Sequence, residues 1–345
     1  MKDALHSRCE AFIANRDLLR KRFKLESSYL YPICANIFCA RGVTPSEETL
    51  IMCRDILKSK ANAFSNFRGN LSLPIISMLA AGSAPEARMD EAIENYAALK
   101  KYFFRSSYLA LAAFALADMG MGARAIDHVE RGREIYDRMK KEHPFLTSAE
   151  DSVFAVLLSF SEKPLEQMVD EMEQIYGMVK ERFSSGNAAQ SVSHVLSVSA
   201  DDPSQKVKKF FSLYDGIRES GGKYGKHYQL STLAAASLTA LTAGELVQDM
   251  MDIDHYLSEQ KGYGFLSLDN RTRMMHAAML VSDQECLHRD RLDALMSASG
   301  SEAAERSAAQ TAVLTSTLSM LAAQQAAMCA AVSSSAAVSA SAASH

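Results

Sequence analysis

Residues 134–140 read EIYDRMK, and related stretches return along the chain as ENYAALK at 94–100, QIYGMVK at 174–180 and SLYDGIR at 212–218. The tyrosines of these stretches stand 40, 40 and 38 residues apart, and an apolar residue and then Lys or Arg follow each of them. In residues 124–141 the apolar side chains share one helical face and the charged side chains share the other. We expect each stretch to form an amphipathic outer helix, with its tyrosine ring packed in a hairpin.

A second series of segments, small and apolar, alternates with the charged ones. The last large residue of each apolar segment marks a period, with gaps of 37, 42, 38, 42 and 42 residues; the markers are Leu79, Leu116, Leu158, Leu196, Leu238 and Leu280. These segments lack a polar face of any width, so they must be covered on most sides. Two interlocked series of about forty residues predict stacked helical hairpins.

We therefore predict an all-α chain built as a helical-repeat array, either an open α-solenoid or a closed α/α toroid, since sequence alone does not fix the curvature. Residues 1–25 are expected to form an N-terminal capping helix and residues 26–298 about seven hairpins. Residues 299–332 are Ala- and Met-rich and are expected to form a C-terminal helix, and residues 333–345 a disordered tail.

Composition excludes several classes of protein. The 345 residues carry 37 Lys and Arg against 41 Asp and Glu, a net charge of −4, and both signs mix on the outer helices. This balance leaves no basic field for a polyanion, so we expect no nucleic-acid partner. With 16 Gly and 7 Pro there is little turn chemistry for many short strands. Neither a signal peptide nor a membrane-spanning segment is evident, and six scattered cysteines without a CxxC pair indicate buried thiols in a reducing cytoplasm.

Local signals mark where some helices begin. Residues 44–47, TPSE, and residues 147–150, TSAE, each resemble a capping box. Asp202 followed by Pro203 is typical of an N-cap before a permitted proline. A cluster of basic residues between Arg16 and Lys24 is expected to be the solvated face of the terminal helix, in preference to a phosphate or acidic-partner contact.

Three longer stretches resemble a known family: FRGNL at 67–71, HPFLTS at 143–148 and GFLSLDNR at 264–271, together with the Ala/Gln/Met-rich carboxy terminus. They are similar to an uncharacterised bacterial family, domain of unknown function number 4003, over nearly the whole chain. The resemblance implies a bacterial, cytoplasmic protein and no established site, so no residue role is carried over from it.

Polar residues gather at one register of the repeat, about nine to eleven positions before each leucine marker. Loops at equivalent repeat positions stack into a rim, and such rims often bind ligands. The competing interpretation is that these residues cap the starts of buried helices. The candidate binding residues at this rim are Asn70, Arg105, His143, Asn187, His227, Gln229, Asn270 and Arg271.

We predict a binding or scaffold module for a protein segment or small ligand, without a cofactor or catalytic residue. The alternative is an α/α-type enzyme or metal protein with its site at the same rim. Asp252 and Glu285 each precede a histidine by three residues, a spacing found in di-iron bundles, but the apolar helices offer almost no carboxylates to complete such a site. Nucleotide-binding, zinc-protease and serine-hydrolase motifs are absent.

Overall fold

The computed structural model of the chain describes residues 1–199, 201–264 and 268–296, with the side chains of the last helix described as far as Asp283. These residues form fourteen α-helices and no strand, so the all-α prediction is confirmed. The odd-numbered helices are α1 (Asp3–Arg22), α3 (Glu47–Lys60), α5 (Pro85–Leu99), α7 (Ala125–Glu142), α9 (Leu165–Arg182), α11 (Pro203–Glu219) and α13 (Ala243–Ser258). The even-numbered helices are α2 (Leu30–Ala40), α4 (Ser72–Ala80), α6 (Ser107–Asp118), α8 (Asp151–Leu158), α10 (Gly186–Leu196), α12 (Leu230–Ser237) and α14 (Asn270–Met296).

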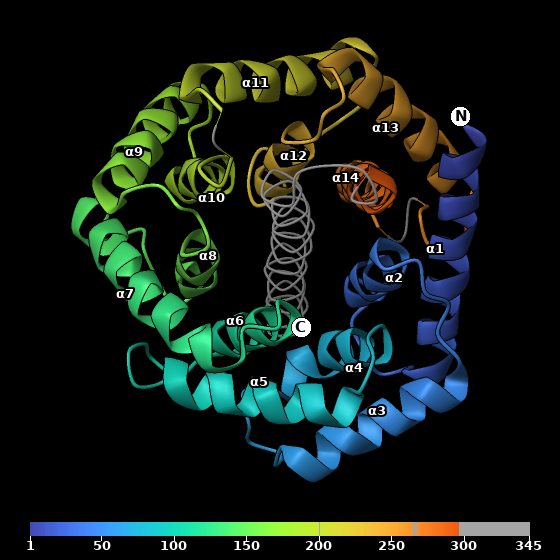
Figure 1. Cartoon of the computed structure of the whole chain (residues 1–345). Helices are drawn as coiled ribbons and strands as arrows, with labels where there is room; N and C mark the ends of the chain where they lie inside the picture. The colour runs from blue at the N-terminus through green and yellow to red at the C-terminus, as the bar shows by residue number, and fades with distance from the viewer. Residues whose placement is uncertain (200, 265–267, 297–345) are drawn as a thin grey trace, which may run out of the picture.

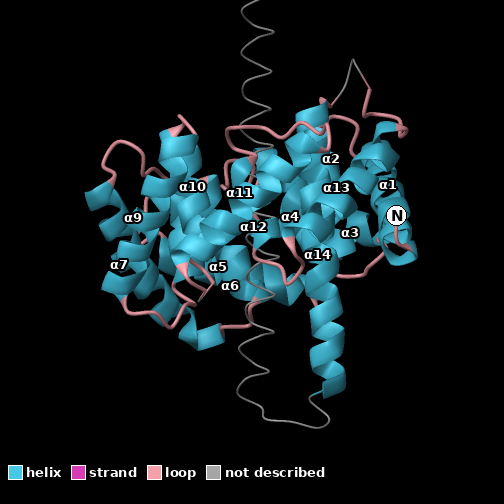
Figure 2. Ribbon diagram, turned by 90° about the horizontal axis from the view of Figure 1, so that it is seen from above, coloured by secondary structure: helices cyan, strands magenta, loops and turns pink. Residues whose placement is uncertain are grey.

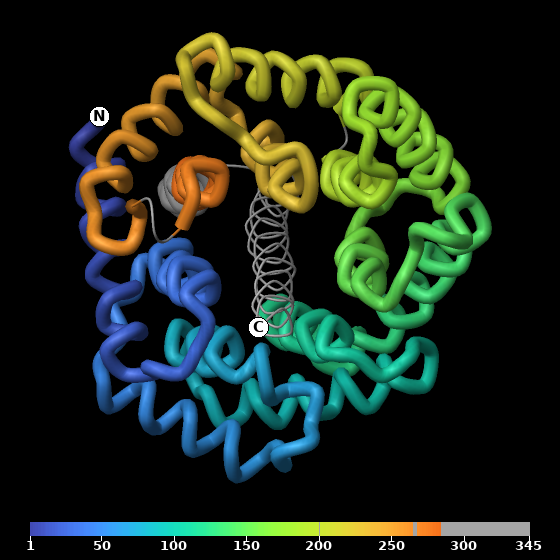
Figure 3. The backbone as a smooth tube through the Cα atoms, turned by 180° about the vertical axis from the view of Figure 1, so that it is seen from behind, coloured from blue at the N-terminus to red at the C-terminus, as the bar shows by residue number. Residues whose placement is uncertain are grey.

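The odd-numbered helices form an outer layer around the even-numbered ones (Figure 1). Each outer helix contacts the inner helix that follows it in the chain. The two ends of the described chain also meet, because α14 contacts α2 and α13 contacts α1. Seen from behind, the first and last outer helices lie side by side (Figure 3). The predicted capping helix is thus an outer helix, which contacts α2, α13 and α14.

The two layers differ in sequence as their burial requires. The inner helix α6 is buried continuously from Leu109 to Ala117. The outer helix α7 buries one stripe that includes Val129, Ile135 and Met139 and turns its charged residues outwards. Gly132 lies in that stripe, where a Cβ atom would stand 3.1 Å from the Cα atom of Val156 on α8. A glycine there lets the outer and inner backbones approach closely.

A buried polar group joins the two ends of the ring. The carboxylate Oδ2 of Asp283 on α14 accepts a hydrogen bond of 2.5 Å from the side-chain amide of Asn36 on α2. The same oxygen lies 3.6 Å from the guanidinium Nη2 of Arg8 on α1. Asp283 and Asn36 are each only 1% exposed, so this polar contact is shielded from water.

The predicted helix starts are confirmed in one case and corrected in two. Asp202 caps α11, where its carboxylate accepts from the Gln205 amide, as predicted. Near residue 47 the cap is Ser46, which accepts from the Thr49 amide. The box predicted at residues 147–150 does not form, because the Thr147 hydroxyl donates to the carbonyl of Met139.

A complete capping box forms instead at α13, between Thr242 and Glu245. The Thr242→Ala variant removes the hydroxyl that accepts from the Glu245 amide, and we expect it to lower the free energy of unfolding by about 1 kcal/mol. Urea denaturation of both proteins measures this change. The Thr242→Ser variant keeps the acceptor and should stay close to the native value; an equal loss in both variants would contradict the capping role.

The ring has two faces, at the top and the bottom of Figure 2. The inner helices begin at one face, here called the start face, where the starts of α8, α10 and α12 line one pocket. They end at the other face, where Arg41 after α2 forms an ion pair with Asp118 at the end of α6. At the opposite face, cationic side chains bind carbonyls at or just beyond the ends of inner helices. Arg88 donates to Met78, Lys163 to Ser197 and Lys209 to Thr239. Cations are favourable at helix C-termini, so these side chains hold that face together.

The division of the chain into a capping helix, hairpins, terminal helix and tail stays a prediction. The terminal helix and tail expected at residues 299–332 and 333–345 lie outside the described residues.

Candidate functional site

The start face carries a pocket with a volume of about 200 Å³. It lies where three successive inner helices, α8, α10 and α12, begin. All of its lining residues except Ala188 carry a polar side-chain group; the lining consists of Glu150, Ser185, Asn187, Ala188, Ser191, His227, Tyr228 and Ser231.

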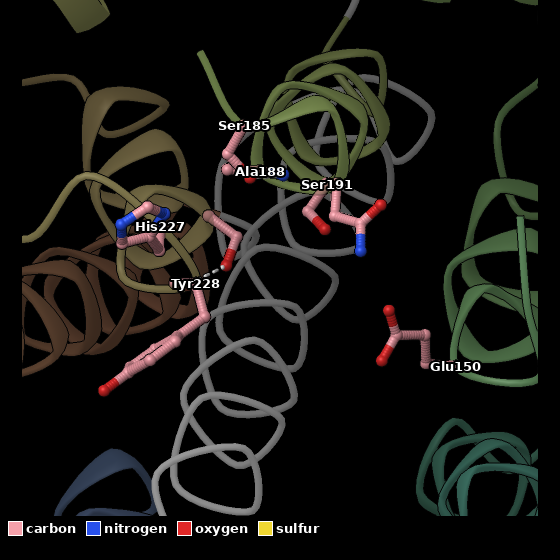
Figure 4. Close-up of a pocket in the computed structure, with 8 residues that line it drawn as sticks. Glu150, Ser185, Ala188, Ser191, His227 and Tyr228 are labelled. Carbon is pink, nitrogen blue, oxygen red and sulfur yellow. Dashed lines mark hydrogen bonds between the residues drawn. The ribbon is translucent and has the colours of Figure 1, made fainter. Parts of the chain in front are cut away.

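Each side of the pocket comes from a different helix start. Glu150 is the residue before α8, and its carboxylate points into the opening (Figure 4). Ser185 caps α10, and Ser191 lies in the second turn of that helix. His227 and Tyr228 belong to the connection that leads into α12, and they form the third side.

The polar groups that line the pocket differ in whether they already form hydrogen bonds within the protein. The hydroxyl of Ser185 accepts from the amide of Ala188, and the hydroxyl of Ser231 donates to the carbonyl of Tyr228. By contrast, the described residues offer no hydrogen-bond partner to four further side chains at the pocket, those of Glu150, Asn187, Ser191 and His227. The pocket therefore presents a carboxylate, an amide, a hydroxyl and an imidazole that are available to a ligand.

A buried polar layer supports this pocket from behind. Asp151, next to Glu150, is 3% exposed, and its Oδ1 lies 3.5 Å from Nδ1 of His194 on α10. Burial raises the pKa of Asp151 to about 7 and lowers the pKa of His194 to about 3, since each loses water around its charged form. The side-chain amide of Gln190 donates to the hydroxyl of Thr147, which joins α10 to the residues before α8. These contacts fix the two helix starts relative to each other.

The structure separates the candidate residues predicted from sequence. Asn187 and His227 come together in the pocket. Gln229 is buried beside it, where a Cβ atom on Gly225 would strike its side chain at 2.2 Å. His143 is half-buried, with Nε2 3.0 Å from the carboxylate of Glu173. The other four residues are exposed, and the pocket does not include them; they are Asn70, Arg105, Asn270 and Arg271.

Six of the eight lining residues are not among the candidates predicted from sequence: Glu150, Ser185, Ala188, Ser191, Tyr228 and Ser231. In the sequence, Glu150 matches the spacing of a capping box, and this pattern does not indicate that it lines a pocket. Ser191 lies one helical turn beyond Asn187, so the spacing of four residues on a helical face was the signal that could have found it.

A second, smaller pocket lies at the starts of α2 and α14, with a volume of about 80 Å³. It contains Arg16 and Arg20, from the basic cluster that was expected to be solvated. Arg16 is instead 5% exposed, and its guanidinium lies over the Tyr263 ring, 5.4 Å from the centroid. The solvated interpretation is therefore wrong for Arg16 and holds for Arg20, which is exposed.

Comparison with known proteins assigns the chain to a family. The family described as "Protein of unknown function (DUF4003)" matches residues 15–326. The chain belongs to this family. It is also similar to "Uncharacterized protein YeaA" of Bacillus subtilis (strain 168), with 27% identity over 214 residues. That match covers 60% of this chain and 63% of the length of the relative, and no solved structure matches significantly.

Membership of the family brings no ligand or activity with it, so the chemistry rests on the residues themselves. Within the described part of the chain, no group of three or more His, Cys, Asp or Glu is placed to hold a metal ion. The same part contains no helix that is long and apolar enough to span a membrane. Cys9, Cys34, Cys39 and Cys53 are free and buried, and burial raises the pKa of each thiol, which disfavours the reactive thiolate.

Proposed function

We propose that the chain is a helical-repeat array, closed as an α/α toroid, that works by binding a small, neutral, hydroxyl-rich molecule at the start face. The observation that carries this proposal is the pocket between the starts of α8, α10 and α12. It joins Asn187 and His227, whose register predicted a binding rim, with the carboxylate of Glu150.

The chemistry of the pocket supports a hydroxyl-rich ligand. A hydroxyl group both donates and accepts hydrogen bonds, and the pocket offers acceptors on Glu150 and both kinds of group on Asn187 and Ser191. Tyr228 also lines the pocket and adds an amphipathic aromatic residue to it. A binding site of this kind combines a few placed polar groups with aromatic surface.

The size of the pocket limits the ligand. A volume of about 200 Å³ is below the range of roughly 300–1,000 Å³ typical of drug-sized ligands. We therefore infer a ligand of about the size of a single sugar ring or a short polyol. A protein segment, the other predicted partner, would enter this pocket only through one side chain.

Binding can be tested by thermal unfolding of the full chain with glycerol, myo-inositol, glucose and galactose. We expect at least one of these compounds to raise the Tm of the native chain by several degrees at a concentration 100-fold above its Kd, because bound ligand stabilises the folded state by about 2.7 kcal/mol. The Glu150→Gln variant removes the charged acceptor and should lose most of this shift.

The control is essential because polyols also stabilise proteins by exclusion from their surface. Glu162 is exposed and lies beyond the end of α8 at the opposite face, so the Glu162→Gln variant loses the same charge away from the pocket. It should respond as the native chain does. If all three proteins shift equally with every compound, the pocket does not bind this class of ligand.

One observation favours the enzyme alternative. Asp151, with its pKa raised to about 7, has the proton affinity of a general acid and directly follows Glu150. It ranks second because Asp151 is buried and does not line the pocket. Conversion of a bound compound by the native chain, lost in the Asp151→Asn variant, would establish catalysis; recovery of the compound unchanged supports binding alone.

The remaining sequence-based inferences keep the status of predictions. We propose a cytoplasmic location, from the cysteine usage, and function without a cofactor or a nucleic-acid partner.

A further inference from the structure

Four large apolar side chains project from the start face almost fully into solvent. They are Leu25 (102% exposed), Phe64 (99%), Phe104 (88%) and Phe145 (98%), here called the apolar tips. Every other large apolar residue in the part of the chain described with side chains is less than half exposed. Scattered surface leucines need no explanation, but four fully exposed apolar side chains at equivalent places do.

The apolar tips share one structural position. Each lies in a connection from the end of an outer helix to the start of an inner helix: α1 to α2, α3 to α4, α5 to α6 and α7 to α8. They therefore lie on the same face, along the part of the ring that these four hairpins form (Figure 1). The tips are 39, 40 and 41 residues apart in sequence.

Neighbouring residues show that this exposure is specific. Phe103 is 6% exposed, and its ring packs 5.5 Å from the Tyr136 ring, whereas the adjacent Phe104 turns outwards. Phe67 is 3% exposed, three residues beyond Phe64. Each of these two connections thus contributes one phenylalanine to the core and leaves a second one free at its end.

The connections that bear the tips are basic, in contrast to the chain as a whole. Lys24 and Arg105 directly adjoin Leu25 and Phe104, and Lys141 lies four residues before Phe145. Across residues 20–28, 58–70, 100–106 and 140–148 the acidic residues are Glu26 and Glu142 alone. In these four connections, therefore, basic residues outnumber acidic ones.

Several of these cations are free to meet an external anion. Within the described part of the chain, ion pairs occupy Lys21, with Glu47, and Lys60, with Asp90. No described residue forms an ion pair with Lys24, Lys100, Lys101, Arg105 or Lys141, and all five are exposed. Exposed cations beside apolar tips are complementary to an anionic lipid surface, where headgroups meet the charges and the tips enter the acyl boundary.

We propose that the start face docks on an anionic membrane surface through the apolar tips. A protein partner would favour a continuous apolar patch, and a nucleic acid has no apolar layer to receive four separate side chains. A lipid surface receives each tip independently. This role concerns the half of the ring around α1–α8 and does not depend on what occupies the pocket between α8 and α12.

Vesicle co-sedimentation of the full chain tests the proposal. We expect binding to vesicles of phosphatidylcholine with phosphatidylglycerol, little binding to phosphatidylcholine alone, and weaker binding as salt is added. A variant carrying both Phe104→Ser and Phe145→Ser should bind at least about tenfold more weakly, because it lacks the two rings that would be buried in the lipid. The folding of this variant is checked by its Tm, which should be almost unchanged because both side chains are exposed.

The matched control is Ile126→Ser. Ile126 is 38% exposed and lies in the first turn of α7, away from the start face. This variant should bind the anionic vesicles as the native chain does. Equal losses in both variants, or no binding of the native chain to anionic vesicles, would overturn the proposal. If the chain does not bind vesicles but binds an oligonucleotide in a way that requires Phe104, the apolar tips would be assigned to nucleic-acid binding instead.

Insertion itself can be observed because the chain contains no tryptophan. A Phe104→Trp variant carries a single indole at a tip, and its emission should shift to shorter wavelength when anionic vesicles are added. An Ile126→Trp variant should show no shift. An unchanged spectrum for the Phe104→Trp variant, measured while the protein is bound to vesicles, would exclude insertion of this tip and contradict the proposal.

Discussion

Replacement of Asp283 by alanine is expected to lower the free energy of unfolding by about 3–5 kcal/mol, the cost of breaking a buried charged contact. Asp283 joins three helices where the ring closes, since it accepts from Asn36 on α2 and lies 3.6 Å from the guanidinium of Arg8 on α1. The alanine variant removes this acceptor and leaves the amide and the guanidinium in a buried environment. Urea denaturation, followed by circular dichroism, measures the loss.

A surface aspartate provides the matched comparison. Asp55 forms an ion pair with Arg54 on α3, and its side chain is 57% exposed. The Asp55→Ala variant should cost less than about 1 kcal/mol, because exposed ion pairs contribute little. If Asp283→Ala proves equally mild, the contact between the two ends of the described chain does not hold the ring closed.

Acidification is expected to destabilise the chain through His276. This side chain is 1% exposed, its Nδ1 lies 2.7 Å from the Tyr263 hydroxyl, and burial together with the charge of Arg16 lowers its pKa to about 3. A histidine whose pKa is lower in the folded state contributes stability above its unfolded pKa of about 6.5, and this contribution is lost as the pH falls towards 3. Between pH 6.5 and 4.5 the loss amounts to about 2 kcal/mol.

His194, which is also buried, should contribute less to the net change in stability with pH. His194 has a lowered pKa, but its neighbour Asp151 has a raised one, and a raised carboxyl pKa stabilises the folded state as the pH falls from about 7 towards 4. The two shifts therefore offset each other over this window.

Paired denaturation curves at pH 6.5 and 4.5 isolate the contribution of His276. The His276→Gln variant keeps a hydrogen-bonding group for Tyr263 but does not titrate, so its stability should fall by about 2 kcal/mol less than that of the native chain. His255 is exposed, and His255→Gln should retain the native pH dependence. If the His276→Gln variant loses as much stability between pH 6.5 and 4.5 as the native chain does, another group causes the acid sensitivity.

The helical class was predictable because it depends on local pattern. The outer helix α7 segregates Val129 and Ile135 from its charges, whereas α6 is apolar without interruption from Leu109 to Ala117. Amphipathic and buried helices could therefore be distinguished by their sequence pattern alone. The meeting of the two ends was not predictable. It depends on contacts such as that of Asn36 with Asp283, which are 247 residues apart in sequence and carry no local signal.

The site was predictable only in part, for a related reason. Asn187 and His227 share a register, and the stacking of equivalent loops brings them into one pocket. The sequence does not distinguish a capping Glu150 from one that lines a pocket, because a carboxylate near a helix start suits both roles. Likewise, sequence does not distinguish the buried Phe103 from the exposed Phe104, since the path of one connection decides which ring turns inwards.

Hydrogen–deuterium exchange of the full chain tests the central claim most directly. Exchange would be measured with and without one compound, the one that raises the Tm of the native chain most and loses this effect in the Glu150→Gln variant. Bound ligand should slow exchange in the first turns of α8, α10 and α12, around Glu150, Asn187 and Ser231, and leave the distant start of α4 unchanged. Protection spread evenly over all helices, or confined to helices outside the pocket, would contradict the assignment of this pocket as the binding site.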